Sequence, residues 1–155
     1  MASLNKKDYI SPPLSIKEFF QKRNKILIWH DKGGLGDVYM HRMVFEDFKN
    51  IVPDADFVFA CLPEYMDAVS DHPYISEVID SRRVNPQDYI AIYKTCVTIA
   101  DRYEHVRAPF CLDHRSDIWA KYCGVELQHH NMHFRLDPDI LKNVQENLRQ
   151  YKQDG

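Results

Sequence analysis

Glycine and aspartate gather at one point of this chain in a pattern suited to holding a ligand. Three of the five glycines lie within four residues, at Gly33, Gly34 and Gly36, and Asp37 follows them directly. Glycine permits a positive φ and lets a ligand approach the backbone closely. A carboxylate beside such a loop can accept the proton of a hydroxyl group as that hydroxyl attacks another molecule. This segment is therefore the first candidate for a functional site.

Asp37 has two interpretations at the level of sequence. An aspartate in the first turn of a helix accepts backbone N–H groups and interacts favourably with the positive end of the helix dipole, so it can act purely as a cap. The same side chain can instead face a cleft and serve as a general base. The residues alone leave both interpretations open.

The known nucleotide-binding motifs do not fit the loop. A dinucleotide fingerprint that begins Gly34-x-Gly36 requires a third glycine where Tyr39 stands. A P-loop requires Lys and then Ser or Thr after its last glycine, whereas Gly36 is followed by Asp37 and Val38. Asp37 would also repel a phosphate placed at this point. The sequence therefore predicts no nucleotide cofactor.

Basic and titratable residues near the loop form two further candidate groups. The first flanks the loop and can contact an anionic acceptor or a leaving diphosphate: Lys32, His41 and Arg42. The second can form a basic rim suited to a phosphorylated glycolipid: Arg82, Arg83, Arg102, Arg107 and Arg115. For both groups the alternative is an ordinary solvated surface.

Histidine and cysteine are close in sequence near the C-terminal part of the chain, at Cys111, His114, His129, His130 and His133. Zinc requires four well-placed nitrogen or sulfur ligands, and the chain has no Cys-x-x-Cys pair. Strand or surface histidines account for the pattern better, so no metal site is predicted.

The composition is that of one ordinary folded domain. The chain has 155 residues, a net charge of −3 and 45% hydrophobic residues, and no apolar run long enough to cross a membrane. The near-neutral charge gives no basic face for nucleic acid. The start of the chain lacks an apolar secretory segment, so its four cysteines are expected to be free thiols in the cytoplasm.

Alternating strands and helices predict an α/β fold with a Rossmann-like open, mainly parallel sheet and helices on both faces. Strands are expected at 25–30, 56–61, 75–79, 89–93 and 131–136, the fourth continuing as far as Thr98. Helices are expected at 37–52, 63–70, 114–123 and 138–151. Residues 1–24 are expected to form an arm with a short helix, and residues 25–155 the domain itself. Ligands of such sheets bind beyond the carboxyl ends of the strands, where the glycine loop is placed.

Several segments together resemble the N-terminal part of the ADP-heptose lipopolysaccharide heptosyltransferases. The similar segments are 25–28, 34–38, 51–56, 72–79, 88–89, 113–125 and 133–136. The most specific of them is the run from Gly34 to Val38, which contains Gly36 and Asp37. The chain departs from the family at His41 and Met43, near positions where the family often has a small hydroxyl residue and a proline.

The resemblance implies the GT-B fold, in which two Rossmann-like domains face each other across a cleft. The N-terminal domain, corresponding to residues 25–155, would bind a sugar or glycolipid acceptor, and Asp37 would be the base of an inverting transfer. A second domain, expected to be missing from this chain, would bind the nucleotide-sugar donor, so the chain alone is expected to be inactive. Peripheral contact with a membrane is a further expectation.

Two other functions compete with this interpretation. The chain can be a stand-alone, non-catalytic α/β module that keeps the fold and binds a partner. It can also be a small flavodoxin-like cofactor binder, although the missing phosphate motifs weigh against that.

Overall fold

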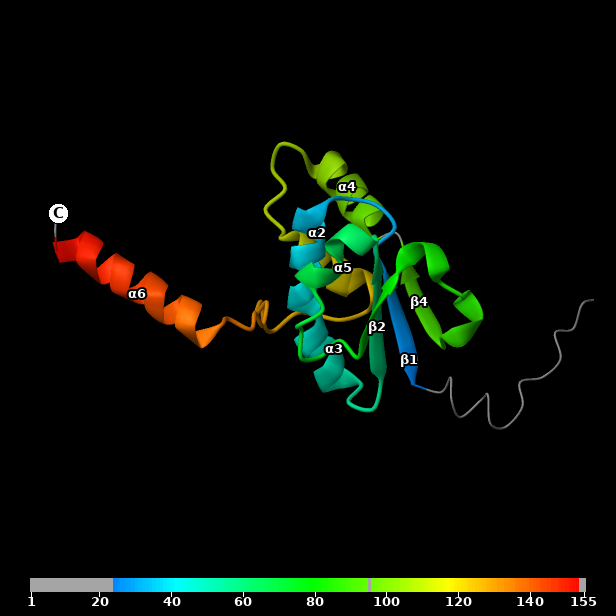
Figure 1. Ribbon diagram of the computed structural model, residues 1–155. Helices are drawn as coiled ribbons and strands as arrows, with labels where there is room; N and C mark the ends of the chain where they lie inside the picture. Colours follow the sequence, from blue (N-terminus) through cyan, green and yellow to red (C-terminus); the bar gives the residue numbers. More distant parts are fainter. Residues whose placement is uncertain (1–23, 95, 154–155) are drawn as a thin grey trace, which may run out of the picture.

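The computed structural model describes residues 24–94 and 96–153 and contains an open, all-parallel sheet (Figure 1). Its four strands lie in the order β3-β2-β1-β4. Their bounds are β1 Lys25–Trp29, β2 Asp56–Cys61, β3 Glu77–Asp80 and β4 Ala91–Lys94. The predicted Rossmann-like α/β fold is confirmed.

The two central strands are buried on both faces, which explains their nearly continuous apolar sequences. In β1, Leu27 and Ile28 point to opposite sides of the sheet and belong to two different cores. In β2, Val58 joins the core of Leu27, and Phe59 joins the core of Ile28. Each central strand therefore supplies both layers of the protein.

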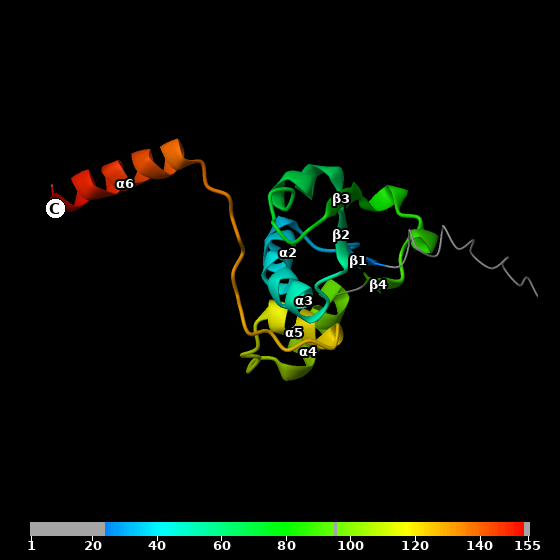
Figure 2. The same cartoon turned by 90° about the horizontal axis from the view of Figure 1, so that it is seen from below.

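The helices cover the two faces unevenly. The elements are α2 Leu35–His41, η1 Arg42–Val44, α3 Phe45–Ile51, η2 Pro63–Ala68, η3 Ser81–Arg83, η4 Pro86–Asp88, α4 Cys96–Arg107, α5 Arg115–Tyr122 and α6 Pro138–Gln153. Helices α2, α3 and α5 pack on one face, and α4 packs beside α5 (Figure 2). The connection from β3 to β4 covers the other face, where Val84 and Tyr89 pack against the core of Leu27.

Helix α4 is the main element that the sequence did not indicate. It begins at Cys96, so the predicted continuation of the fourth strand to Thr98 is wrong. The β-branched start of this segment favours a strand by local propensity. Val97 and Ala100, three residues apart, instead pack together with Trp119 of α5. Tertiary packing therefore overrides the local preference.

The expected last strand is also absent, because residues 131–136 run as irregular backbone. Their main chain is bonded to side chains and not to the sheet. The Arg42 guanidinium donates to the carbonyl oxygens of Met132 and His133, and Asp71 accepts the N–H of Arg135. Side chains thus form the backbone hydrogen bonds that a neighbouring strand would otherwise form.

Three other expectations are refined. The predicted helix 37–52 begins at Leu35 and includes a 3-10 turn, and the predicted helix 63–70 is the 3-10 helix η2. The expected helices 114–123 and 138–151 are present as α5 and α6, and Gly124 ends α5 with a positive φ of 78°. The short helix expected before residue 24 lies outside the described residues.

Helix α6 projects away from the sheet and its covering helices (Figure 1). It carries an exposed apolar stripe of Ile140, Leu141, Val144 and Leu148. No helix among the described residues is long and apolar enough to cross a membrane.

Arg42 is a fully buried cation that joins three parts of the chain. Besides its two bonds to the 132–133 backbone, the guanidinium donates to the Ala68 carbonyl oxygen at 2.7 Å and to Asp71 Oδ1 at 2.6 Å. The Arg42 hydrogen bond lowers the pKa of Asp71. Arg42 therefore fixes η2 and the irregular 131–136 segment against η1.

Replacing Arg42 should destabilise the fold strongly. Arg42→Met keeps much of the side-chain volume but leaves three carbonyl groups and Asp71 without their donor. We expect the free energy of unfolding in urea to fall by about 3 kcal/mol. The matched control Arg83→Met removes a cation that is 86% exposed, and it should change stability by less than about 0.5 kcal/mol. Equal effects of the two substitutions would contradict the role of Arg42.

Candidate functional site

The glycine loop lies where the order of the strands reverses. The chain places β2 and β3 on one side of β1 and β4 on the other. In open α/β sheets, ligands bind in the crevice outside the carboxyl ends of the strands at such a reversal. The loop that follows β1 and the helix α4 that follows β4 both border this position. Topology and glycine content therefore select the same edge of the sheet.

Arg115 of α5 gathers three carboxylates at this edge. Its guanidinium donates to Asp37 Oδ1 and Asp101 Oδ1 at 2.7 Å each, and to both oxygens of Glu104 at 2.7 Å. Lys32 Nζ lies 3.4 Å from the other oxygen of Asp101. We call these five residues the carboxylate cluster. Three carboxylates face two cations, so the cluster carries one negative charge in excess.

Asp37 acts as a helix cap in this structure. Its Oδ2 accepts the backbone N–H of Gly34 at 3.2 Å, while the Gly34 carbonyl accepts the N–H of Asp37 at 3.1 Å. The other carboxylate oxygen is bonded to Arg115. A carboxylate has about four acceptor positions, so these two bonds leave capacity for a further donor. The capping interpretation is confirmed, and the general-base interpretation remains a prediction.

The three glycines of the loop play different parts. Gly33 has a φ of 106°, and a Cβ added there would lie 2.5 Å from Asp37 Oδ2, so a side chain is not tolerated. Gly34 and Gly36 are exposed, and a Cβ on either would meet no atom within 4 Å. Gly33 therefore shapes the loop, whereas Gly34 and Gly36 leave open space where side chains would otherwise lie.

Two of the residues expected to contact a ligand do not reach this space. His41 and Arg42 are buried, with exposed fractions of 1% and 0%. The His41 ring stacks on the Trp119 ring, with 3.9 Å between the ring centroids. The Arg42 guanidinium donates to the carbonyl oxygens of Met132 and Ala68. They lie on the inner side of the α2–η1 segment, and only Lys32 of the three flanking residues joins the cluster. The expected contact of His41 and Arg42 with an acceptor is not met.

The buried imidazole of His30 lies against the inner side of the glycine loop at Gly33. His30 follows β1, is 3% exposed and packs beside Phe59 and Tyr65. Burial, reinforced by the nearby His41, lowers the pKa of His30 to about 4. The ring is therefore neutral near pH 7 and acts as part of the core beneath Gly33.

The other candidate ligand residues from the sequence have separate partners. His129, His130 and His133 each contact a different carboxylate, namely Asp47, Asp117 and Glu46. No group of three residues able to hold a metal ion is found in the part of the chain that the structure describes. Of the expected basic rim, Arg82 and Arg83 pair with Asp80, and Arg115 belongs to the carboxylate cluster.

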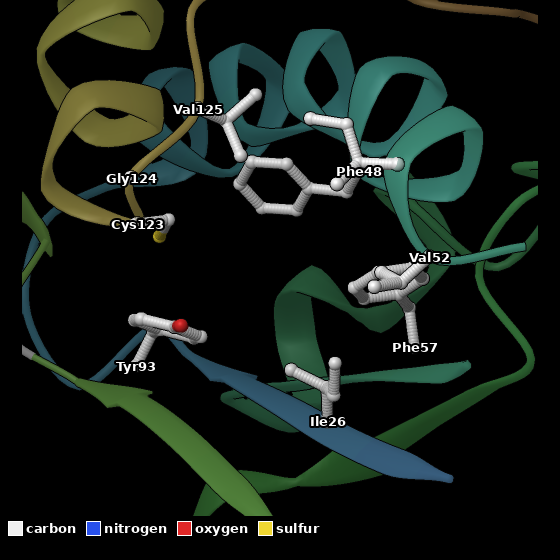
Figure 3. Close-up of a pocket in the computed structure, with 9 residues that line it drawn as sticks. Ile26, Phe48, Val52, Phe57, Tyr93, Cys123, Gly124 and Val125 are labelled. Atoms are coloured by element: carbon white, nitrogen blue, oxygen red, sulfur yellow. The ribbon is translucent and has the colours of Figure 1, made fainter.

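Sequence reasoning missed an apolar pocket of about 170 Å³ (Figure 3). It lies between α3, the sheet and the end of α5, towards the amino ends of β1 and β2. No Asp, Glu, Lys, Arg or His side chain lines it. Its lining residues are Ile26, Phe48, Ile51, Val52, Phe57, Tyr93, Cys123, Gly124 and Val125.

Comparisons with known proteins do not show a family or a function for this chain. Searches of the chain against protein-family models, curated proteins and solved structures give no significant match. The resemblance to heptosyltransferases therefore remains a prediction. Any function has to be argued from the strand-order reversal, the exposed glycines and the carboxylate cluster.

Acid should destabilise the protein through its buried histidines. Burial lowers the pKa of His30 and of His72 from 6.5 to about 4, so the unfolded chain takes up protons before the folded chain does. Stability is then full above about pH 6.5 and falls towards pH 4, by up to about 3 kcal/mol per histidine. Urea unfolding across this range measures the loss, which should be clearly smaller in His30→Phe.

Two comparisons make this measurement specific. The pKa of the exposed His129 is raised by its hydrogen bond to Asp47, so His129 contributes in the opposite direction and reduces the total slope. The control His105→Gln changes an exposed histidine and should keep the wild-type pH dependence. An unchanged slope in His30→Phe would contradict a neutral, buried His30.

Proposed function

We propose that this chain is the acceptor-binding domain of an inverting glycosyltransferase of the heptosyltransferase type, which uses a nucleotide-diphosphate sugar. One observation carries the proposal: the Asp37 carboxylate, held by Gly34 and Arg115, lies at the strand-order reversal in a loop whose Gly34 and Gly36 are exposed. The Asp37 side chain is 16% exposed and still has acceptor capacity, so a hydroxyl group that approaches the loop can donate to it.

The charge of the cluster favours a neutral, hydroxyl-rich acceptor. Carboxylates accept hydrogen bonds from sugar hydroxyls, and Lys32 offers a donor that is 61% exposed. The negative charge in excess opposes a phosphate at this point. A leaving nucleoside diphosphate would therefore need cations from elsewhere, which is the task of a second domain in a two-domain transferase.

The proposed reaction assigns one role to each of two residues. Asp37 accepts the proton of the acceptor hydroxyl as its oxygen attacks the anomeric carbon of the donor sugar, and the nucleoside diphosphate departs from the opposite side. Arg115 holds the Asp37 carboxylate in a fixed orientation through the 2.7 Å bond. Such positioning is needed because a base acts efficiently only when its oxygen is already directed at the proton.

A second candidate, a non-catalytic binding module, is favoured by the internal pairing of the cluster. Arg115 binds all three carboxylates and thereby joins α2, α4 and α5. A purely structural network needs no substrate. The two candidates differ in whether removing the Asp37 charge affects transfer or only stability.

Asp37→Asn tests the catalytic assignment. The amide keeps the size of the side chain but accepts a proton poorly, so in a protein that also carries the donor domain the transfer rate should fall by ~10² or more. Asp67→Asn is the matched control, because Asp67 is exposed on η2. A near-wild-type rate in Asp37→Asn would remove Asp37 from the chemistry.

Acceptor binding can be measured on this chain directly. Titration of the ¹⁵N-labelled chain with neutral saccharides should shift the amide resonances of Gly34 and Gly36, and inorganic phosphate should shift them much less. Shifts confined to other regions, or a stronger response to phosphate, would contradict the acceptor site and favour the binding module.

A further inference from the structure

An apolar groove runs along the amino ends of the central strands. The pocket of about 170 Å³ described above shares Ile26, Ile51 and Val52 with a second pocket of about 310 Å³. The second pocket is also lined by Asn24, Pro53, Asp54, Ala55 and Ile90. We call the two pockets together the apolar groove. Ile51 and Ile90 are 59% and 57% exposed, and apolar side chains gathered in this way mark a surface that another apolar group covers.

The chain that precedes β1 joins the domain at this groove. Asn24 lines the second pocket, and its carbonyl oxygen accepts the N–H of Asp56 at 2.6 Å, which fixes Asn24 beside the start of β2. Residues 1–23, which lie outside the described residues, are therefore attached at the groove itself. Helix α6 is attached elsewhere, because Phe134 packs against Tyr39 of α2 with 5.7 Å between the ring centroids. The segment before β1 is thus better placed than α6 to cover the groove.

The sequence before β1 has the apolar pattern that such a groove requires. A capping box at 15–18 predicts a short helix, and Ile16, Phe19 and Phe20 follow one another at positions i, i+3 and i+4 on one face of it. An apolar cavity of about 150 Å³ is large enough to take up benzene. The first pocket, at about 170 Å³, therefore has room for one phenyl ring, and the second pocket is larger.

Charge and chain length agree with this occupant. Asp54 is the one charged residue among the described residues that line the groove, whereas the segment 14–23 contains three basic residues and one acidic residue. Opposite charges favour the approach of the segment to the groove. Phe20 lies four residues before Asn24, so its backbone can lie ~6–14 Å from Asn24, depending on whether the chain between them is helical or extended. The segment reaches the groove of its own domain without any other rearrangement.

We propose that residues 14–23 form an amphipathic helix that lies in the apolar groove of the same chain. The rings of Phe19 and Phe20 enter the two pockets, and the charged side chains of the segment remain in water. Removing these rings and the exposed groove residues from water stabilises the docked arrangement. The groove lies at the amino ends of the strands, whereas Asp37 lies beyond the carboxyl end of β1. The proposal therefore does not depend on glycosyl transfer.

NMR spectroscopy of the full chain tests this contact. Isoleucine methyl groups are labelled with ¹³C, and the phenylalanine rings are kept protonated in a deuterated protein. We expect nuclear Overhauser cross-peaks from the rings of Phe19 and Phe20 to the methyl groups of Ile51 and Ile90. These cross-peaks should disappear in the double variant Phe19→Ala, Phe20→Ala, whereas those from the phenylalanines that line the groove should persist. Trypsin should also cleave the folded double variant after Lys17 at least tenfold faster than the wild type.

A matched control and the alternative occupants make the test specific. Phe110→Ala removes a strongly exposed ring in the α4–α5 loop and should leave both the groove cross-peaks and the cleavage rate unchanged. The proposal is overturned if no groove cross-peak comes from Phe19 or Phe20, or if α6 supplies the contacts. Cross-peaks that arise only between differently labelled copies in a mixed sample would overturn it in favour of a second copy. The assigned wild-type cross-peaks decide the question even if the double variant fails to fold.

Discussion

The guanidinium of Arg115 is the interaction on which the candidate site depends. Asp37, Asp101 and Glu104 come from two helices, and close to one another they would repel in the absence of a cation. A planar guanidinium can bond three carboxylates at once, which an ammonium group cannot do with the same geometry. The hydrogen bonds to Glu104 and Asp37 raise the pKa of Arg115 further, so its charge is permanent. One cation, 25% exposed to solvent, thus joins α2, α4 and α5 at this edge of the sheet.

Local signals in the sequence predicted those parts of the fold in which burial and propensity agree. Strand β2 was predicted residue for residue, because both of its faces are buried and its apolar run is continuous. The end of α5 was predicted from Gly124, which alone can adopt its left-handed backbone easily. Helix α4 was missed because its β-branched start favours a strand, and only contact with α5 decides for the helix. The segment 131–136 was misassigned because Arg42, ninety residues away, holds its backbone.

The candidate site likewise combines residues that a local sequence pattern reveals with residues that only the fold brings together. The glycines and Asp37 are adjacent in the chain, so their pattern is visible in the sequence. The partners of Asp37 are not, since Arg115 lies 78 residues further along and Asp101 and Glu104 belong to the missed helix. His41 and Arg42 were assigned to a ligand because charged residues near a loop are normally exposed. Burial of Arg42 becomes possible here only because four acceptors surround its guanidinium.

The capping bond and the ion pair of Asp37 are compatible with a catalytic role, because a base has to be held in place before it can act. Gly33 brings the backbone so close that the carboxylate has little freedom, and Arg115 fixes one of its oxygens. The positions that remain on the carboxylate are therefore limited in direction, and the open side of Gly34 and Gly36 is where a ligand meets no side chain. A cap buried on all sides would need no such opening. The proposed transfer depends on this combination of a constrained carboxylate with two open glycines, because a base that is fixed in advance needs no reorientation when a hydroxyl group arrives.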